Sequence, residues 1–189
     1  MKKEFTITWR EEPFIKCIGW FFAYPNEEVS LNELSKKVSM SKTSVRKIVL
    51  RLIKDGFLVN QELGGVWRLK VNKTHYYSKT LKISFNLENI LMSNIVDEIK
   101  ETYPGSRAII LFGSYRKGDD IEGSDVDIAV ELLGKKEVEI KELKILPKLG
   151  YRDNVKVNLL IFSRKKIDIN LFSNVANGIV LEGFLEVNP

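Results

Sequence analysis

The stretch that most constrains the fold is a pair of apolar runs joined by a polar, glycine-containing loop. The first run, 108–112, ends at Gly113-Ser114, and the second opens on two aspartates, Asp125 and Asp127. Residues two apart in an extended strand point to the same face, so the aspartates are predicted to project together beside the glycine turn. Paired carboxylates bind hard divalent cations, and backbone N–H groups in such a turn can bind phosphates. The pattern therefore predicts a site for a metal-bound nucleoside triphosphate.

This stretch resembles the signature of minimal nucleotidyltransferases in the DNA polymerase β-like superfamily, and the resemblance extends over roughly residues 84–183. The signature has Gly-Ser, then a basic residue and a glycine, then Ser-Asp-x-Asp. The resemblance implies a mixed β-sheet flanked by helices and transfer of a nucleoside monophosphate from an NTP with Mg²⁺ or Mn²⁺. It implies that Asp125 and Asp127 hold the metal and are catalytic. The residues it assigns to the nucleotide are Gly113, Ser114, Lys117, Gly118 and Ser124.

One position departs from the family pattern. The family has a third carboxylate on a neighbouring strand, and the matching apolar run, 155–162, has Asn158 there. The third metal position therefore lacks a charge that helps to fix the ions in phosphoryl-transfer chemistry. Asp153 is an odd number of residues away and faces the other side of a regular strand unless a bulge intervenes. Two hypotheses stay open: a Mg²⁺-dependent nucleotidyltransferase, which we favour, and a nucleotide-binding domain with weak or no catalysis.

The N-terminal part of the chain has the pattern of three helices. Apolar residues recur at helical spacing over 11–24. Ser30 and Glu33 have the spacing of a capping box for a second helix. Ser41 is positioned to cap a third helix, which is predicted to end at Gly56.

Two extended runs, 57–63 and 66–71, follow these helices and are joined by Gly64-Gly65, which predicts a β-hairpin. Three helices and a hairpin resemble a winged helix-turn-helix domain, over roughly residues 10–72. The resemblance implies that the third helix enters the DNA major groove.

Charge supports a nucleic-acid partner for this domain. Residues 1–80 have 15 Lys and Arg against 8 Asp and Glu, whereas residues 81–189 have 15 against 17. A basic surface is typical of nucleic-acid binding, although many winged helices bind proteins or a neighbouring domain instead. Thr43 and Arg46 are the expected base readers. The full set of expected DNA-binding residues is Lys42, Thr43, Ser44, Arg46, Lys47 and Arg51 on the third helix and Arg68 on the wing.

The expected organisation is α+β with two domains. The winged helix-turn-helix domain spans 1–73, a polar connector spans 74–85, and the nucleotidyltransferase domain spans 86–189. Helices are expected in the last domain over 86–102 and 135–148. Its strands are expected at 107–112, 125–132 and 155–162, and the run 179–184 returns to apolar character.

Other residues limit the function classes. With Cys17 as the only cysteine and His75 as the only histidine, neither a disulfide nor a structural zinc site is expected. Neither a signal peptide nor a membrane span is expected, and we expect a cytoplasmic protein.

The resemblances also imply classes of partner. Minimal nucleotidyltransferases modify partner proteins, as in toxin–antitoxin pairs with a separate helical toxin, or nucleic-acid ends or small molecules. The sequence does not choose among these acceptors. An alternative is a DNA-binding regulator or antitoxin with a catalytically inactive domain. A homodimer is expected by analogy with other winged helices.

Overall fold

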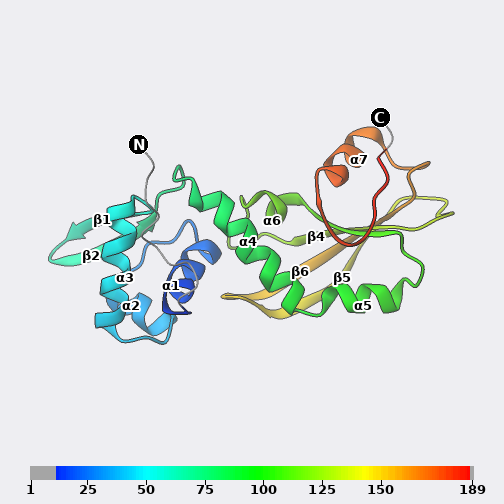
Figure 1. Cartoon of the computed structure of the whole chain (residues 1–189). Coiled ribbons are helices and arrows are strands. Elements are labelled where there is room, and N and C mark those ends of the chain that lie inside the picture. The colour runs from blue at the N-terminus through cyan, green and yellow to red at the C-terminus, as the bar shows by residue number, and fades with distance from the viewer. Residues whose placement is uncertain (1–11, 188–189) are drawn as a thin grey trace. The chain divides into compact units, whose positions relative to one another are not determined.

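The computed structural model describes residues 12–187 and divides the chain into two compact units, residues 1–78 and 79–189. Most elements of both units are labelled in Figure 1. Within residues 12–187, no helix combines the length and the apolar character needed to span a membrane.

The described part of the first unit consists of three helices followed by a two-stranded antiparallel hairpin. The helices are α1 (Glu12–Ala23), α2 (Leu31–Lys37) and α3 (Lys42–Asp55), and the strands are β1 (Leu58–Leu63) and β2 (Val66–Val71). Apolar side chains from all three helices and both strands form its core. The largest fully buried ones are Trp20, Phe21, Leu34, Leu52, Phe57 and Leu69.

Local signals in the sequence explain where these helices begin and end. The side-chain oxygen of Ser30 accepts a hydrogen bond from the Glu33 N–H, and the Glu33 carboxylate accepts one from the Ser30 N–H, which completes a capping box for α2. Ser41 caps α3 in the same way. Gly56 ends α3 with a φ of 83°, a left-handed conformation that glycine adopts without strain. These predictions are confirmed.

The second unit contains a five-stranded sheet in the order β5-β6-β4-β3-β7. Strands β4 and β6 are parallel, and the other neighbouring pairs are antiparallel. The strand bounds are Ala108–Phe112 for β3, Val126–Glu131 for β4, Glu139–Leu149 for β5, Arg152–Phe162 for β6 and Ile179–Gly183 for β7. The expected α+β class, with a mixed sheet flanked by helices, is therefore confirmed.

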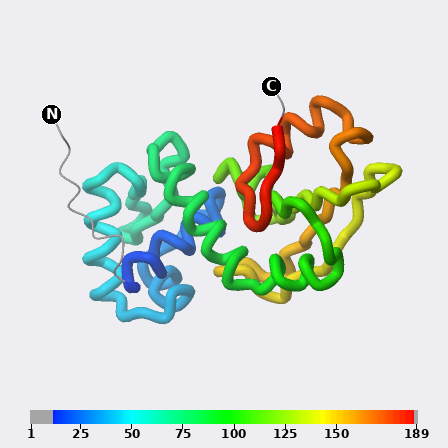
Figure 2. Tube along the Cα trace, turned by 45° about the vertical axis from the view of Figure 1, so that its right-hand side comes forward, coloured from blue at the N-terminus to red at the C-terminus, as the bar shows by residue number. Residues whose placement is uncertain are grey.

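Helices cover both faces of this sheet (Figures 1 and 2). On one face lie α4 (Tyr77–Met92), which begins just before the boundary between the units, and α5 (Ile95–Thr102). On the other face lies α7 (Ile169–Ala176). The short helix α6 (Gly113–Lys117) follows β3 directly. The side chains buried beneath α4 and α5 include Ile90, Ile95, Ile99, Leu111, Ile128, Val157 and Leu159.

The helix predicted over 135–148 is wrong, because this stretch contains β5 instead. Its many charged residues favour a helix when they are considered alone. However, Pro147 cannot be accommodated in a helix interior without losing a hydrogen bond, whereas an edge strand tolerates proline. Strand β5 lies at the edge of the sheet, where its charged side chains remain in solvent.

The single helix predicted over 86–102 is two helices. Helix α4 ends at Met92, and α5 begins after Asn94, whose φ of 60° interrupts the helical path. Helix α4 also begins at Tyr77, so most of the predicted connector 74–85 is helical. Polar residues on the exposed side of α4 obscured its helical period in the sequence.

Candidate functional site

The sheet register brings the two ends of the polar loop together. Phe112, the last residue of β3, pairs with Asp127 on β4, and Asp127 pairs on its other side with Asn158 on β6. Residues in direct register across a sheet have side chains on the same face. The glycine turn, the second aspartate and the asparagine expected at the third metal position are therefore neighbours.

Position 113 favours glycine because of its backbone conformation and because the space beside it is occupied. The φ of Gly113 is 71°, and a Cβ atom built on it would lie 2.4 Å from Oδ2 of Asp127. Any side chain at position 113 would collide with the carboxylate. The absence of a side chain lets the backbone that leads into Ser114 and α6 approach Asp127 closely.

Asn158 links the two aspartates. Its Nδ2 donates a hydrogen bond to Oδ2 of Asp125 at 3.1 Å and a longer one to Oδ1 of Asp127 at 3.5 Å. Burial raises the pKa of Asp127, while the Asn158 hydrogen bond lowers it and the charge of Asp125 raises it. Two carboxylates that repel each other and are partly removed from water favour a cation between them.

The donor atoms fit one divalent cation. Asp125 and Asp127 supply hard carboxylate oxygens, and a half-turn of the Asn158 amide would present its neutral Oδ1 to the same space. Across residues 12–187, no three Asp, Glu, His or Cys side chains are grouped closely enough to hold a metal ion. In this arrangement of side chains, a cation would meet two charged protein ligands and one neutral oxygen.

The other residues expected at the nucleotide have different surroundings. Lys117 is exposed in the last turn of α6. Gly118 ends α6 with a φ of 70°, and a Cβ atom there would lie 2.5 Å from the carbonyl oxygen of Lys79. The hydroxyl of Ser124 accepts a hydrogen bond from the Ile121 N–H at 2.9 Å and so closes the turn before Asp125. The loop from α6 to β4 is held in place at both ends.

A buried polar network fixes the same loop, and sequence reasoning missed it. The Asp120 carboxylate contacts Lys82 at 3.2 Å, accepts a hydrogen bond from Asn86 at 2.7 Å and pairs with Arg152. Arg152 also donates to the Tyr115 hydroxyl at 2.8 Å. Burial lowers the pKa of Lys82 and raises that of Tyr115 to about 12. These residues join α4 and the start of β6 to the segment between Gly113 and Asp125.

A sequence signal for this network exists on α4. Lys82, Asn86 and Ile90 are spaced by four residues, so they share one helical face, and all three are buried. A lysine and an asparagine in line with a core isoleucine indicate buried polar partners.

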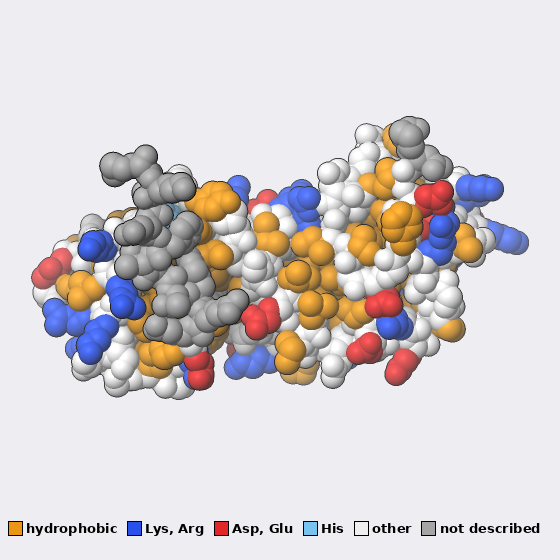
Figure 3. All heavy atoms as spheres, in the orientation of Figure 1, with side chains coloured by type: hydrophobic (Ala, Val, Ile, Leu, Met, Phe, Trp, Pro, Cys, Tyr) orange, Lys and Arg blue, Asp and Glu red, His pale blue; other side chains and the backbone are white. Residues whose placement is uncertain are grey.

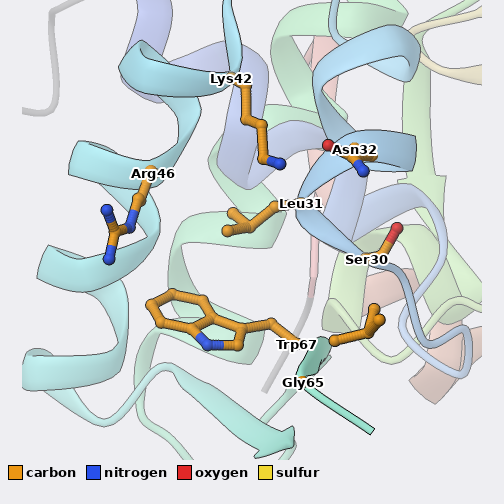
Figure 4. Close-up of a pocket in the computed structure, with 8 residues that line it drawn as sticks. Ser30, Leu31, Asn32, Lys42, Arg46, Gly65 and Trp67 are labelled. Atoms are coloured by element: carbon orange, nitrogen blue, oxygen red, sulfur yellow. The ribbon is translucent and has the colours of Figure 1, made fainter. Parts of the chain in front are cut away.

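The first unit has a pocket of about 430 Å³ between α2, α3 and the hairpin (Figure 4). The Arg46 guanidinium carbon lies 5.6 Å from the centroid of the Trp67 ring, and Lys42 extends into the space from the start of α3. One cationic group thus lies over the aromatic ring, and a second lines the same pocket. The pocket is lined by Ser30, Leu31, Asn32, Lys42, Arg46, Gly65, Val66 and Trp67.

The remaining residues expected at DNA lie on the surface of the same elements. Thr43, Lys47 and Arg51 are exposed on α3, and Arg68 is exposed on β2. Ser44 takes part in the cap of α3 through its contacts with Ser41. Figure 3 shows lysine and arginine side chains over α2, α3 and the hairpin.

Comparison with known proteins agrees with the geometry of the second unit. No curated protein matches the chain. A family model described as the nucleotidyltransferase domain matches residues 92–179, a segment that contains Gly113, Asp125, Asp127 and Asn158. Residues 92–179 are therefore similar to the nucleotidyltransferase domain.

Proposed function

We propose that the second unit binds an NTP with Mg²⁺ or Mn²⁺ and transfers its nucleoside monophosphate to a hydroxyl acceptor. The observation that carries the proposal is the close approach of the Gly113 backbone to the Asp127 carboxylate. This approach puts N–H groups able to bind phosphate beside carboxylates able to bind the cation. In the transfer, the acceptor oxygen bonds to the α-phosphorus, pyrophosphate leaves, and the hydroxyl proton passes to water.

The residues of the chain would act by holding and orienting the NTP. Asp125 and Asp127 would hold the cation, which would neutralise charge on the phosphates when bound. The turn at Gly113 and Ser114 would contact the triphosphate, with Lys117, Gly118 and Ser124 in the loop that follows. The acceptor classes are a partner protein, such as a helical toxin, and a nucleic-acid end.

Incubation with each α-labelled NTP and Mg²⁺ or Mn²⁺, with the purified protein alone and in lysate, tests the transfer. We expect one or more labelled products, and no labelling with the double variant Asp125→Ala/Asp127→Ala. NTP binding is measured separately by calorimetry. Binding without any labelled product would support the alternative of a nucleotide-binding regulator, for which the neutral Asn158 is the favouring feature.

We further propose that the first unit is a winged helix-turn-helix domain that binds DNA. The position of Lys42 and Arg46 around the pocket between α3 and the hairpin supports this proposal. Lysines and arginines neutralise phosphates, and this contribution weakens as salt concentration rises. DNA binding together with a nucleotidyltransferase-like domain fits a cytoplasmic regulator of a gene that encodes its own partner.

DNA binding is tested by fluorescence anisotropy with a random duplex at several salt concentrations. The variant Lys42→Ala/Arg46→Ala/Lys47→Ala should bind more weakly, and its salt slope should be shallower by about 0.9 for each phosphate contact removed. The control Lys16→Ala/Lys36→Ala/Lys70→Ala removes equal charge from other elements of the same unit. Equal losses in both triple variants would show a general charge effect and count against α3 as the binding element.

A further inference from the structure

Strand β5 places one more carboxylate on the sheet face that has the candidate site. Glu142 pairs in register with Asn158, whose other neighbour in register is Asp127. The three side chains therefore form a row across β5, β6 and β4 on one face. Within this row, Glu142 and Asp127 lie on opposite sides of the neutral Asn158.

An ion pair independently shows which face Glu142 occupies. Lys156 lies two residues before Asn158 on β6, so both side chains point to the same side of the strand. The Nζ atom of Lys156 lies 3.6 Å from Oε2 of Glu142. The side chain of Glu142 is thus on the side of Asn158, although it is turned along the strand toward the lysine.

This part of the sheet face is open to solvent. Ile140 and Ile145 are 73% and 50% exposed, and the Glu142 side chain is 47% exposed. An exposed pair such as Glu142–Lys156 contributes little free energy, because water screens both charges. The Glu142 carboxylate is therefore held weakly and can turn toward Asn158 at small cost.

The length of the side chain fits the distance to be crossed. Neighbouring strands lie about 4.8 Å apart, and an extended glutamate side chain puts its carboxylate oxygens roughly one such spacing from its Cα. A carboxylate displaced by one strand can then reach the space above Asn158, where Nδ2 contacts both aspartates.

We propose that Glu142 supplies the third carboxylate of the cation site, from β5 instead of β6. The inference rests on the proposed cation binding at Asp125 and Asp127. On binding, the cation would replace Lys156 as the partner of Glu142. The departure at Asn158 is then a relocation of the third charge. With Glu142 turned from Lys156 toward the cation, the site would have a third carboxylate that it lacks in the arrangement described above.

The test is calorimetric titration of the full chain with MnCl₂ and no nucleotide. The variant Glu142→Gln should bind Mn²⁺ at least about tenfold more weakly than the wild type. The matched control is Asp153→Asn, which removes the same charge from an exposed position on β6, five residues or about 16 Å from Asn158. This control should bind Mn²⁺ as the wild type does.

A second variant tests the relocation directly. Adding Asn158→Asp to Glu142→Gln returns the third charge to β6 and should restore most of the lost affinity. Wild-type affinity in Glu142→Gln, with binding abolished in Asp125→Ala/Asp127→Ala, would overturn the inference and leave the proposed function intact. Equal losses in Glu142→Gln and Asp153→Asn would also overturn it. No Mn²⁺ binding by the wild type would overturn both proposals.

Discussion

The backbone of Gly113 lies so close to Asp127 that a Cβ atom at position 113 would be 2.4 Å from the carboxylate oxygen Oδ2. The contact joins the first residue of α6 to β4. The two residues are fourteen positions apart in the chain and lie close together because Phe112 pairs with Asp127 in the sheet. This site and the polar network beside it lead to five predictions.

Gly113→Ala should strongly weaken both Mn²⁺ and NTP binding, because the new methyl group would displace the Asp127 carboxylate. Gly134→Ala is the matched control: its φ is 77°, but no atom lies within 4 Å of the added Cβ. Both variants should lose about 1–2 kcal/mol of stability from left-handed backbone strain. Calorimetry and thermal unfolding separate the two effects, and equal binding by both variants would contradict the steric argument.

Asn158→Asp should lower the melting temperature without added cation and increase the stabilisation that Mn²⁺ gives. The substitution removes the hydrogen bonds to Asp125 and Asp127 and adds a third negative charge beside them. A bound cation would offset that repulsion, and ligand binding to the folded state raises stability by mass action. Asn158→Ala, which removes the hydrogen bonds without adding charge, should gain no extra stabilisation from Mn²⁺. Thermal unfolding with and without MnCl₂ measures both differences.

As the pH decreases, Mn²⁺ affinity should begin to fall at a higher pH than it would at a site built from aspartates of ordinary pKa. Burial raises the pKa of Asp127, the Asn158 hydrogen bond lowers it, and the charge of Asp125 raises it, with a net upward shift. Since the cation needs the carboxylate form, Mn²⁺ binding is lost as the pH falls through this raised pKa. Calorimetry between about pH 7 and about pH 4 follows the loss. A midpoint at or below the ordinary aspartate range would contradict the prediction.

The raised pKa of Asp127 also predicts that its ionised carboxylate destabilises the folded protein at neutral pH. A carboxyl group whose pKa is raised by folding stabilises the folded state at low pH, and this contribution is lost as the pH rises through the raised pKa. Asp127→Asn should therefore melt at a higher temperature than the wild type at about pH 7, with a smaller difference at about pH 4. The measurement is made without divalent cations, which would stabilise the wild type alone.

Asp120→Ala should destabilise the second unit by about 3–5 kcal/mol, because it removes the carboxylate shared by the buried Lys82 and Arg152. Asp119→Ala removes the same charge from the exposed neighbouring position and should change stability by less than about 0.5 kcal/mol. Urea unfolding measures both variants. If they were equally stable, the network would contribute no more than a surface charge.

The parts of the fold that depend on short stretches of sequence could be predicted. The cap of α2 by Ser30, the end of α3 at Gly56 and the turn at Gly64-Gly65 each depend on residues within a few positions of one another. The pairing of Asp125 with Asp127 was predictable for the same reason, because strand geometry alone puts them together.

The parts that depend on strand order could not be predicted. Glu142 is 16 residues from Asn158 in the sequence and becomes its neighbour only because β5 pairs with β6. Asp120 lies 38 residues from Lys82 and 32 from Arg152, so no local pattern joins them. The helix predicted over 135–148 failed for a related reason, since charged residues suit an edge strand as well as a helix surface.

The amide of Asn158 also has a consequence for how the protein behaves when divalent ions are scarce. A neutral donor that hydrogen-bonds to both aspartates offsets part of their repulsion without any ion, so the second unit can fold at low ion concentration. Structural metal sites couple folding to the metal, and proteins with such sites lose their structure in chelators. In the second unit, by contrast, cation binding at the proposed site would be independent of folding. A chelator would therefore empty the proposed cation site and leave the second unit folded.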